Sequence, residues 1–478
     1  MKSVHVIATT FALLVASEHA TAEQTAHPFV IVDGSLNEWQ NQGIRDVAFA
    51  DEEHLYLRVR TDRVMNLQAN DQRVQIWLDI DGSAATGYSR ELLGSSVSSG
   101  ADVEIEFSPK PRSLGVAVWH VDDDGKRTRI IPSRIGLIHA PTYAAKEFEI
   151  RLLRRPAGIG DQQVDESGQL TSWRSVRGAI SVPSDLKKDS SRLDTFLIRT
   201  PPPRAPRRTS EIVAQRDTDA VRIVSYNVRN TSLLENPEPF TRIFNALNPD
   251  IILIQEWRKG DAATVRQWFD DRMPRSTSWH VSQVTKRGEV IVSRRPLEHA
   301  IGSSKDVYIG TDVHTTVGRV GIVNLHLTCC GTLDSDEDRA RVAQATELNR
   351  ALRKMDRGIL VVGGDVNLVG SRRPLDILRS HADADGTDLA VARTMVMGDS
   401  AIYTWRHPEK VFAPDNLYFP PGRHDYIVYS DSTAEMRQSF VLDTAILSDA
   451  ALDAAGLRRS DSLASDHLPV IIDVVPRK

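Results

Sequence analysis

Two kinds of hydrophobic pattern divide this chain of 478 residues. In its first part, short segments alternate apolar and polar residues, and clusters of Gly, Asp and Ser separate them. Alternation at every second residue is typical of strands with one buried face. The segments lie at residues 55–60, 74–78, 103–107, 116–121 and 148–152. They predict an all-β sandwich.

The second part alternates continuous apolar runs with segments of helical periodicity. Strands are predicted at residues 221–226, 251–255, 289–293, 315–327, 359–363, 426–429 and 470–474. Helices are predicted at residues 239–247 and 336–353. The apolar face of the second helix includes Ala340, Ala343, Leu348 and Leu352. Such an alternation indicates a mixed α/β layered domain.

A proline- and arginine-rich run, PPPRAPRR at residues 201–208, separates the two patterns. Such a run is stiff and extended, and it joins helices or sheets poorly. We therefore expect a β-sandwich module at residues 28–198, a linker at residues 199–216 and an α/β domain at residues 217–478.

The first 22 residues have the form of a secretory signal peptide. Lys2 supplies the positive charge, residues 6–16 are mostly apolar, and Ala20-Thr21-Ala22 fits a cleavage site. An ordinary helix or a membrane anchor is the alternative, but the apolar run is too short to span a bilayer. We expect export to the periplasm or the extracellular space, with no membrane span.

Charge and cysteine content narrow the function classes. A net charge of -5 argues against a protein that coats polyanions, although a local basic groove would suffice for a nuclease. The two cysteines, Cys329 and Cys330, are adjacent. They could form a vicinal disulfide, a thiol site or two unpaired thiols. We favour the disulfide, which an exported protein permits and which would be strained and labile.

Motifs of the first part resemble the carbohydrate-binding module family 9 and related sandwich modules. They are IVDGSLNEW at residues 31–39, LDIDG at 78–82, TGY at 86–88 and GAD at 100–102. The resemblance implies a carbohydrate or cell-surface ligand for this module. It also implies a structural Ca²⁺ on Asp79, Asp81 and Asp102, because carboxylates suit calcium.

Each of these features has a simpler explanation that stays open. The three aspartates could only terminate strands and build turns. Trp39, Trp77 and Trp119 could stack on sugars, but a tryptophan in a strand is more often part of the core. We therefore assign no ligand to them.

Polar motifs follow the apolar runs of the second part. They are SYN at residues 225–227, QE at 255–256, NLH at 324–326, GGDVN at 363–367, HDY at 424–426 and SDH at 465–467. Asn, Glu, Asp and His thus recur where strands should end, and there a packed scaffold can fix their geometry. These groups suit a divalent cation, a phosphate and a water nucleophile.

This ordered set is similar to the signature of the endonuclease/exonuclease/phosphatase superfamily, whose fold is that of deoxyribonuclease. The resemblance covers residues 219–475. It implies a four-layer α/β/β/α sandwich and a hydrolase acting on phosphoric ester bonds. It further implies Mg²⁺ or Mn²⁺ as the cofactor and in-line attack of water on the phosphorus.

The resemblance assigns Glu256 as the main metal ligand and places Asp466 near the metal. A carboxylate at the end of an apolar strand is costly to bury unless it meets a cation. Asn227 would contact the metal through water or bind phosphate oxygens. As an isolated residue, Asn227 would be read as an ordinary turn residue.

Further roles follow from the same resemblance. Asp365 would position the attacking water, and Asn367 would bind phosphate and stabilise the transition state. Asp365 and Asn367 are two positions apart, so their side chains would lie on the same side of an extended chain. The Gly-Asp-x-Asn sequence could also be a plain β-turn. Asp425 and His467 would form a carboxylate–imidazole dyad that stabilises charge or transfers a proton.

His326 would contact the scissile phosphate or act as a general acid. Deoxyribonuclease-, sphingomyelinase- and phosphatase-like branches tend to carry His here, whereas abasic-site endonucleases tend to carry Tyr. Glu289 is a candidate to orient His326.

Two classes of function remain. The first is an exported metal-dependent phosphodiesterase, with nucleic acid slightly preferred over lipid head groups or small phosphoesters. Five arginines could line a groove for such a polyanion: Arg287, Arg294, Arg295, Arg372 and Arg373. The second is a non-catalytic sugar- or surface-binding protein with a degenerate catalytic domain. The polar motif positions are all filled, which counts against the second class.

Overall fold

The computed structural model describes residues 30–478 except 71, 84, 88–99, 110–114, 123, 157–158, 160–172, 185–190, 201–202, 205–207, 210–215, 231, 304, 356–357 and 408–418. The expected signal peptide, Tyr88 and most of the linker lie outside the described residues. No helix in the described part of the chain is both long and apolar enough to cross a membrane.

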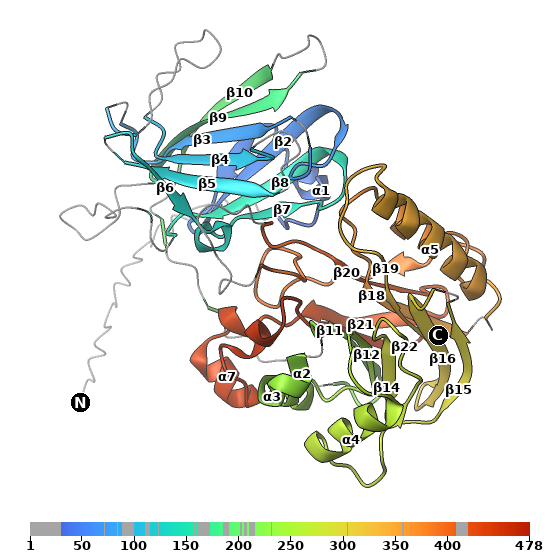
Figure 1. Cartoon of the computed structure of the whole chain (residues 1–478). Coiled ribbons are helices and arrows are strands. Elements are labelled where there is room, and N and C mark those ends of the chain that lie inside the picture. The colour runs from blue at the N-terminus through green and yellow to red at the C-terminus, as the bar shows by residue number, and fades with distance from the viewer. Residues whose placement is uncertain are drawn as a thin grey trace, which may run out of the picture.

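The first domain consists of two antiparallel sheets that face each other (Figure 1). The four-stranded sheet has the order β1 (Ala48–Ala50), β2 (His54–Met65), β8 (Ala145–Leu153), β7 (Ile138–Ala140). The six-stranded sheet has the order β10 (Ser191–Arg199), β9 (Ser175–Pro183), β3 (Val74–Asp79), β4 (Val103–Phe107), β5 (Val116–Val121), β6 (Arg127–Ile130). Apolar side chains such as Leu57, Ile105 and Phe148 fill the space between the sheets. The predicted β-sandwich is confirmed.

The second domain contains two six-stranded mixed sheets. One has the order β13 (His280–Val281), β14 (Val290–Ser293), β12 (Ile251–Gln255), β11 (Val221–Asn227), β22 (Val470–Pro476), β21 (Ala434–Val441). The other has the order β15 (Leu297–Gly302), β16 (Tyr308–Thr315), β17 (Gly318–His326), β18 (Ile359–Asp365), β20 (Asp425–Tyr429), β19 (Ala390–Val391). Alternate apolar residues of both sheets, among them Ile223, Leu253 and Val361, pack between them.

Helices cover the outer faces of the two sheets. The helices α3 (Pro237–Leu247), α4 (Ala262–Arg272) and α7 (Asp449–Ala455) pack on the sheet that contains β11. The helices α5 (Asp336–Leu352) and α6 (Arg373–Arg379) pack on the sheet that contains β18 (Figure 1). Because each sheet buries both faces, its central strands read as continuous apolar runs. The four-layer α/β/β/α architecture is confirmed.

The register brings the ends of the motif-bearing strands to one edge. β11 and β12 are parallel, and Asn227 pairs with Gln255. β17 and β18 are also parallel, with His326 opposite Asp365, and Asp365 in turn lies opposite Asp425 of β20. The carboxyl ends of adjacent parallel strands therefore place these side chains together.

Several elements, among them α4, β15 and β21, were not predicted from the sequence, and two of the predicted elements differ in detail. The run at residues 315–327 is not one strand, because Thr315 ends β16 and β17 begins at Gly318 after a tight turn. On α5, Ala343 is exposed, whereas Arg341 is buried. The Arg341 guanidinium donates to the carbonyls of Thr328 (2.9 Å) and Cys330 (2.7 Å). These hydrogen bonds satisfy the buried charge and hold the loop that contains both residues in place.

The two domains share a continuous interior. Val32 and Tyr56 of the first domain belong to the same apolar cluster as the inner strands of the second. Val32 also pairs with Ala401 as a β-bridge. A buried ion pair joins Arg151 of β8 to Asp399.

Candidate active site

A cavity of about 340 Å³ lies at the strand edge described above. Residues from all the predicted motifs of the second domain except SYN line this cavity. Residues of the first domain line it as well. The lining residues used below are Asn66, Gln68, Thr142, Glu256, His326, Asp365, Asn367, Asp466 and His467.

Asp365 is the centre of this cluster. Its Oδ2 lies 3.5 Å from His326 Nε2, 3.6 Å from His467 Nε2 and 3.2 Å from Asn227 Nδ2. Burial raises the pKa of Asp365 to about 6, the two imidazoles oppose the rise, and Asp425 adds to it. The carboxylate therefore titrates close to neutral pH, as a group that handles a proton should.

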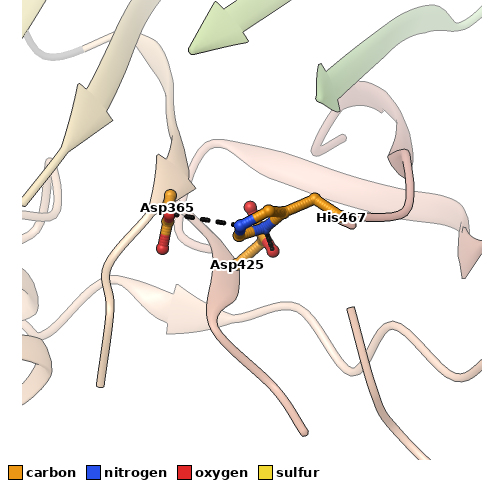
Figure 2. Close-up of side chains that lie close together, drawn as sticks. All are labelled: Asp365, Asp425 and His467. Carbon is orange, nitrogen blue, oxygen red and sulfur yellow. Dashed lines mark hydrogen bonds and ion pairs between the residues drawn. The ribbon is translucent and has the colours of Figure 1, made fainter. Parts of the chain in front are cut away.

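Asp425 and His467 form the predicted dyad. Asp425 Oδ2 lies 2.8 Å from His467 Nδ1, and Figure 2 shows the imidazole between Asp425 and Asp365. Burial alone would lower the pKa of His467, but these two carboxylates outweigh it and raise the pKa to about 10. His467 is therefore an imidazolium at neutral pH.

A second carboxylate–imidazole pair faces the first. Glu289 is fully buried, and its Oε1 lies 3.5 Å from His326 Nδ1. The hydroxyl of Thr285 donates to the other carboxylate oxygen. Glu289 thus occupies the orienting position suggested for it, and Asp365 lies between two imidazoles that are each backed by an acid.

Glu256 follows β12 in a left-handed conformation, with φ of 66°. Such a backbone costs energy for a residue with a side chain, and it persists where surrounding contacts determine it. The backbone N–H of Asn230 donates to Glu256 Oε2 (2.8 Å), and Asn227 Nδ2 donates to Oε1 (3.3 Å). Burial raises the pKa of Glu256, but His326 and the Asn230 N–H outweigh it, so the net shift is downward.

Asn227 presents its amide nitrogen to the site, because its Oδ1 accepts a hydrogen bond from the N–H of Arg229 (3.0 Å). Ser465 Oγ donates to the Asn227 carbonyl (2.8 Å), which ties the SDH segment to the end of β11. Asp466 reaches the same cavity, and its Oδ2 lies 3.8 Å from Arg229 Nε.

Asn367 reaches the cavity by a route that differs from the expectation. It lies beyond β18 with φ of 50°, so the extended-chain explanation is wrong. Its N–H donates to Asp365 Oδ1 (3.0 Å), and its side-chain amide donates to the Leu327 carbonyl (3.2 Å). A side-chain-stabilised turn therefore places it.

Gly364 is required beside this turn. A Cβ there would lie 1.9 Å from the Leu325 carbonyl oxygen of the parallel strand, and its φ is +146°. Only glycine tolerates both conditions.

Two buried or partly buried groups of acids fit metal sites. Asp365, Asp425 and His467 offer ligand atoms within 4.8 Å of one another. Asp425 Oδ2 and His467 Nδ1 already bind each other, and Glu256 and Asp466 line the same cavity without belonging to this compact group. The carboxylate oxygens that line the cavity are hard donors, which suit Mg²⁺ or Mn²⁺.

The second group is in the first domain. Asp79, Asp81 and Asp102 also offer ligand atoms within 4.8 Å of one another, as the calcium expectation requires. The same side chains accept turn hydrogen bonds from Gly82, Ser83 and Ile80. The geometry therefore fits both a Ca²⁺ site and aspartates that only build turns.

Several residues at the site were missed by the sequence analysis. Thr404 is buried, and its Oγ1 accepts the N–H groups of His424 (3.0 Å) and Asp425 (2.9 Å), which fixes the dyad. Asn66 and Gln68 come from the first domain. No local pattern signals these residues, since only the tertiary fold brings them to the cavity.

Two expected binding features lie elsewhere. Arg294 and Arg295 follow β14 at the end of the sheet that carries Asp250, opposite Glu256, and therefore do not line the cavity. The core explanation holds for Trp39 and Trp77, which are buried. The ring of Trp119 is covered by arginine side chains.

Comparison with known protein families gives a match in the second domain. Residues 224–467, just over half of the chain, match the Endonuclease/Exonuclease/phosphatase family. The chain belongs to this family. It is therefore a hydrolase that acts on phosphoester bonds. The match does not include the first domain, so the resemblance to carbohydrate-binding modules stays a prediction.

Solved structures with the fold of this family are similar at low sequence identity. An AP endonuclease from Archaeoglobus fulgidus is 15% identical, with 53% of this chain and 98% of that chain covered and a TM-score of 0.36. A 3′ phosphatase from Neisseria bound to a product DNA hairpin is 20% identical over 53% and 98%, with a TM-score of 0.36. A beta toxin mutant from Staphylococcus aureus with bound magnesium ions is 14% identical over 54% and 100%, with a TM-score of 0.35. No curated protein matches the chain.

Proposed function

We propose that this protein is an exported, divalent-metal-dependent phosphodiesterase. The observation that carries the proposal is the convergence of two acid-backed imidazoles and the Asn227 amide on Asp365 Oδ2, all within 3.6 Å. A degenerate, purely binding domain has no need to keep such a set buried, since burying these groups costs stability.

Each residue of the site has its own role in hydrolysis. Asp365 accepts a proton from water and directs that water to the phosphorus. Asn227, Asn367 and His326 donate hydrogen bonds to the phosphoryl oxygens. The His467 imidazolium, held by Asp425, stabilises charge or protonates the leaving oxygen.

Glu256 and Asp466 would hold the metal ion, with the Asn227 amide beside them. When bound, Mg²⁺ or Mn²⁺ would supply Lewis-acid polarisation of the phosphoryl group. The lowered pKa of Glu256 keeps its carboxylate ionised and available for this role.

Nucleic acid is the first substrate class to test. Arg229 and Arg258 are well exposed, and each lies beside a residue that lines the cavity, Asp466 (3.8 Å) and Glu256 (3.7 Å) respectively. Two exposed cations next to the cavity suit a polyanionic substrate. Lipid head groups and small phosphoesters remain the alternatives.

Two proposals concern the rest of the chain. Residues 1–22 would direct export to the periplasm or extracellular space, and the Cys329–Cys330 disulfide suits such an oxidising compartment. The first domain would bind Ca²⁺ at Asp79, Asp81 and Asp102, and a carbohydrate or cell-surface ligand is its expected partner.

The test compares hydrolysis of bis-p-nitrophenyl phosphate and p-nitrophenyl phosphate with Mg²⁺, with Mn²⁺ and with EDTA. We expect metal-dependent cleavage of the diester, and we expect His467→Ala to lower kcat by roughly 10²-fold or more. His299→Ala, which removes an exposed histidine of β15, is the matched control and should keep full activity. Cleavage of the monoester alone would favour a phosphatase. No turnover of either ester would leave a narrow natural substrate or the binding-protein alternative, and calorimetry of metal binding would separate these two.

A further inference from the structure

The cysteine pair belongs to the wall of the active-site cavity. Cys329 and Cys330 are joined by a disulfide, and both line the cavity together with His326 and with Asn66 and Thr142 of the first domain. Both cysteines are exposed. A bond that can be reduced therefore lies next to the reacting groups, on a surface that solvent reaches.

The loop that contains the pair does not need the bond to keep its shape. Arg341 of α5 donates to the carbonyls of Thr328 (2.9 Å) and Cys330 (2.7 Å). Gln344 of the same helix accepts the N–H of Thr328 (3.0 Å) and donates to its hydroxyl (2.7 Å). A disulfide between adjacent residues also closes a minimal loop, so it removes little entropy from the unfolded chain. The bond is therefore not a structural staple.

Reduction changes the wall rather than the loop. Two sulfur atoms that are not bonded stay at van der Waals distance, which is much longer than a bond. Because Arg341 holds the backbone on either side of Cys329, the side chains take up this change. The cavity of about 340 Å³ is near the lower end of the range for small-molecule sites, so a small intrusion from its wall reduces the room for substrate.

We propose that Cys329–Cys330 is a thiol–disulfide exchange site that controls how well the active-site cavity admits its substrate. Its reaction partner is a low-molecular-weight thiol, and the oxidised form is the one that binds substrate better. The exchange itself is independent of the proposed function. Its effect on hydrolysis rests on that function.

The exchange consumes two molecules of the partner thiol. The thiolate of the first attacks one sulfur of the pair, the S–S bond breaks, and the other cysteine leaves as a thiolate that takes up a proton. The second thiol attacks the mixed disulfide and releases the first cysteine as a thiol. The products are two cysteine thiols and the disulfide of the partner, so two electrons pass to the protein.

Mass spectrometry after alkylation tests the exchange without any assay of activity. The full-length protein is incubated with reduced glutathione and then treated with iodoacetamide. The chain has only these two cysteines, so every added group reports on this pair. We expect the native protein to be alkylated at both cysteines after glutathione and at neither before. If glutathione opens the bond only in urea-unfolded protein, the exchange site is overturned.

Kinetics on bis-p-nitrophenyl phosphate measure the effect on the cavity. We expect reduction to raise KM by about 3- to 10-fold and to leave kcat nearly unchanged, because the change is confined to the wall. The double variant Cys329→Ser, Cys330→Ser resembles the reduced pair in size and cannot form the bond. It should have the raised KM and should not respond to glutathione.

Thr332→Ser is the matched control, since it changes the same loop at a residue that does not line the cavity. It should keep both the KM of the oxidised wild type and the response to glutathione. Equal KM values for oxidised and reduced wild type would overturn the control of substrate entry and leave the proposed function intact. This comparison needs no variant, so it decides the matter even if the serine variant does not fold.

Calorimetry replaces KM if the wild type does not cleave the diester. Binding of bis-p-nitrophenyl phosphate to the oxidised and the reduced protein should then differ by the same 3- to 10-fold, roughly, in Kd. Equal binding would overturn the control of substrate entry. The missing turnover would count against the proposed function alone.

Discussion

At the residue scale, the site is built around the protonation of Asp365. Its carboxylate needs to be free of a proton to accept one from water, whereas His467 needs its proton to stabilise charge. Burial raises the pKa of Asp365, and two carboxylates raise that of His467. The two pKa values, about 6 and about 10, leave both groups in the required state across the neutral range.

The pH profile of kcat/KM tests this assignment. We expect activity to rise as pH increases through about 6, where Asp365 loses its proton, and to fall near 10, where His467 loses its own. Asp425→Asn removes a charge that raises the pKa values of Asp365 and His467, so both limbs of the pH profile should move to lower pH. The activity should also fall by roughly 10²-fold. Asp376→Asn, in an exposed pair with Arg372, should change nothing. An alkaline limb that does not move in Asp425→Asn would refute the dyad.

The sequence predicted this cluster only in part. His326, Asp365, Asp425 and His467 could be identified because each belongs to a motif at a strand end. Thr404 could not, because an isolated threonine in an irregular segment carries no pattern, and its role depends on two backbone N–H groups brought to it by the fold.

At the element scale, strand register does the positioning. β17 and β18 run parallel, so His326 and Asp365 emerge at the same edge, and antiparallel β20 begins there with Asp425. Apolar runs predicted these strands well, because both faces of each sheet are buried. The strand predicted at residues 315–327 corresponds to β17, but β16 was not predicted, because Thr311, Asp312 and His314 interrupt its apolar run.

The turn after β3 allows a prediction about calcium. Burial, reinforced by Asp81 and Asp79, raises the pKa of Asp102 to about 7 against the hydrogen bond from Ile80. The folded carboxyl therefore holds its proton more tightly than the unfolded chain does, and without metal the domain loses stability as pH rises from about 4 to about 7. Ca²⁺ has to displace that proton, so it should bind better at high pH.

Thermal unfolding with Ca²⁺ and with EDTA measures this effect. We expect Ca²⁺ to raise the Tm more at about pH 8 than at about pH 5, and we expect Asp81→Asn to abolish the increase. Asp194→Asn, in the same domain but paired with Arg192, serves as the control. An equal or absent shift at the two pH values would leave the aspartates as turn residues only.

At the scale of the whole molecule, the two domains share an apolar cluster and line one cavity together. The sequence suggested two modules joined by a stiff linker, and nothing in it indicated that they share an apolar interior or a cavity. The contacts join residues that are hundreds of positions apart, and many of them link side chains to backbone groups. Such contacts leave no trace in local periodicity.

Asn66 is the clearest link between the domains, and its removal should lower both catalysis and stability. Asn66→Ala leaves the Leu333 N–H and the Val369 carbonyl without their partner, and it loosens the loop that carries Asn367. We expect kcat to fall about 10-fold and the free energy of unfolding to fall by about 2 kcal/mol. Kinetics on bis-p-nitrophenyl phosphate and urea denaturation measure the two effects.

Asn349→Ala separates the two effects. Asn349 on α5 also donates to two backbone carbonyls, those of Leu378 (3.2 Å) and Ser380 (2.8 Å), but it lies within the second domain and away from the cavity. Its replacement should cost a similar free energy of unfolding and leave kcat unchanged. If Asn66→Ala lowers kcat no more than Asn349→Ala does, the first domain does not support the active site, because a general loss of stability would then explain both variants.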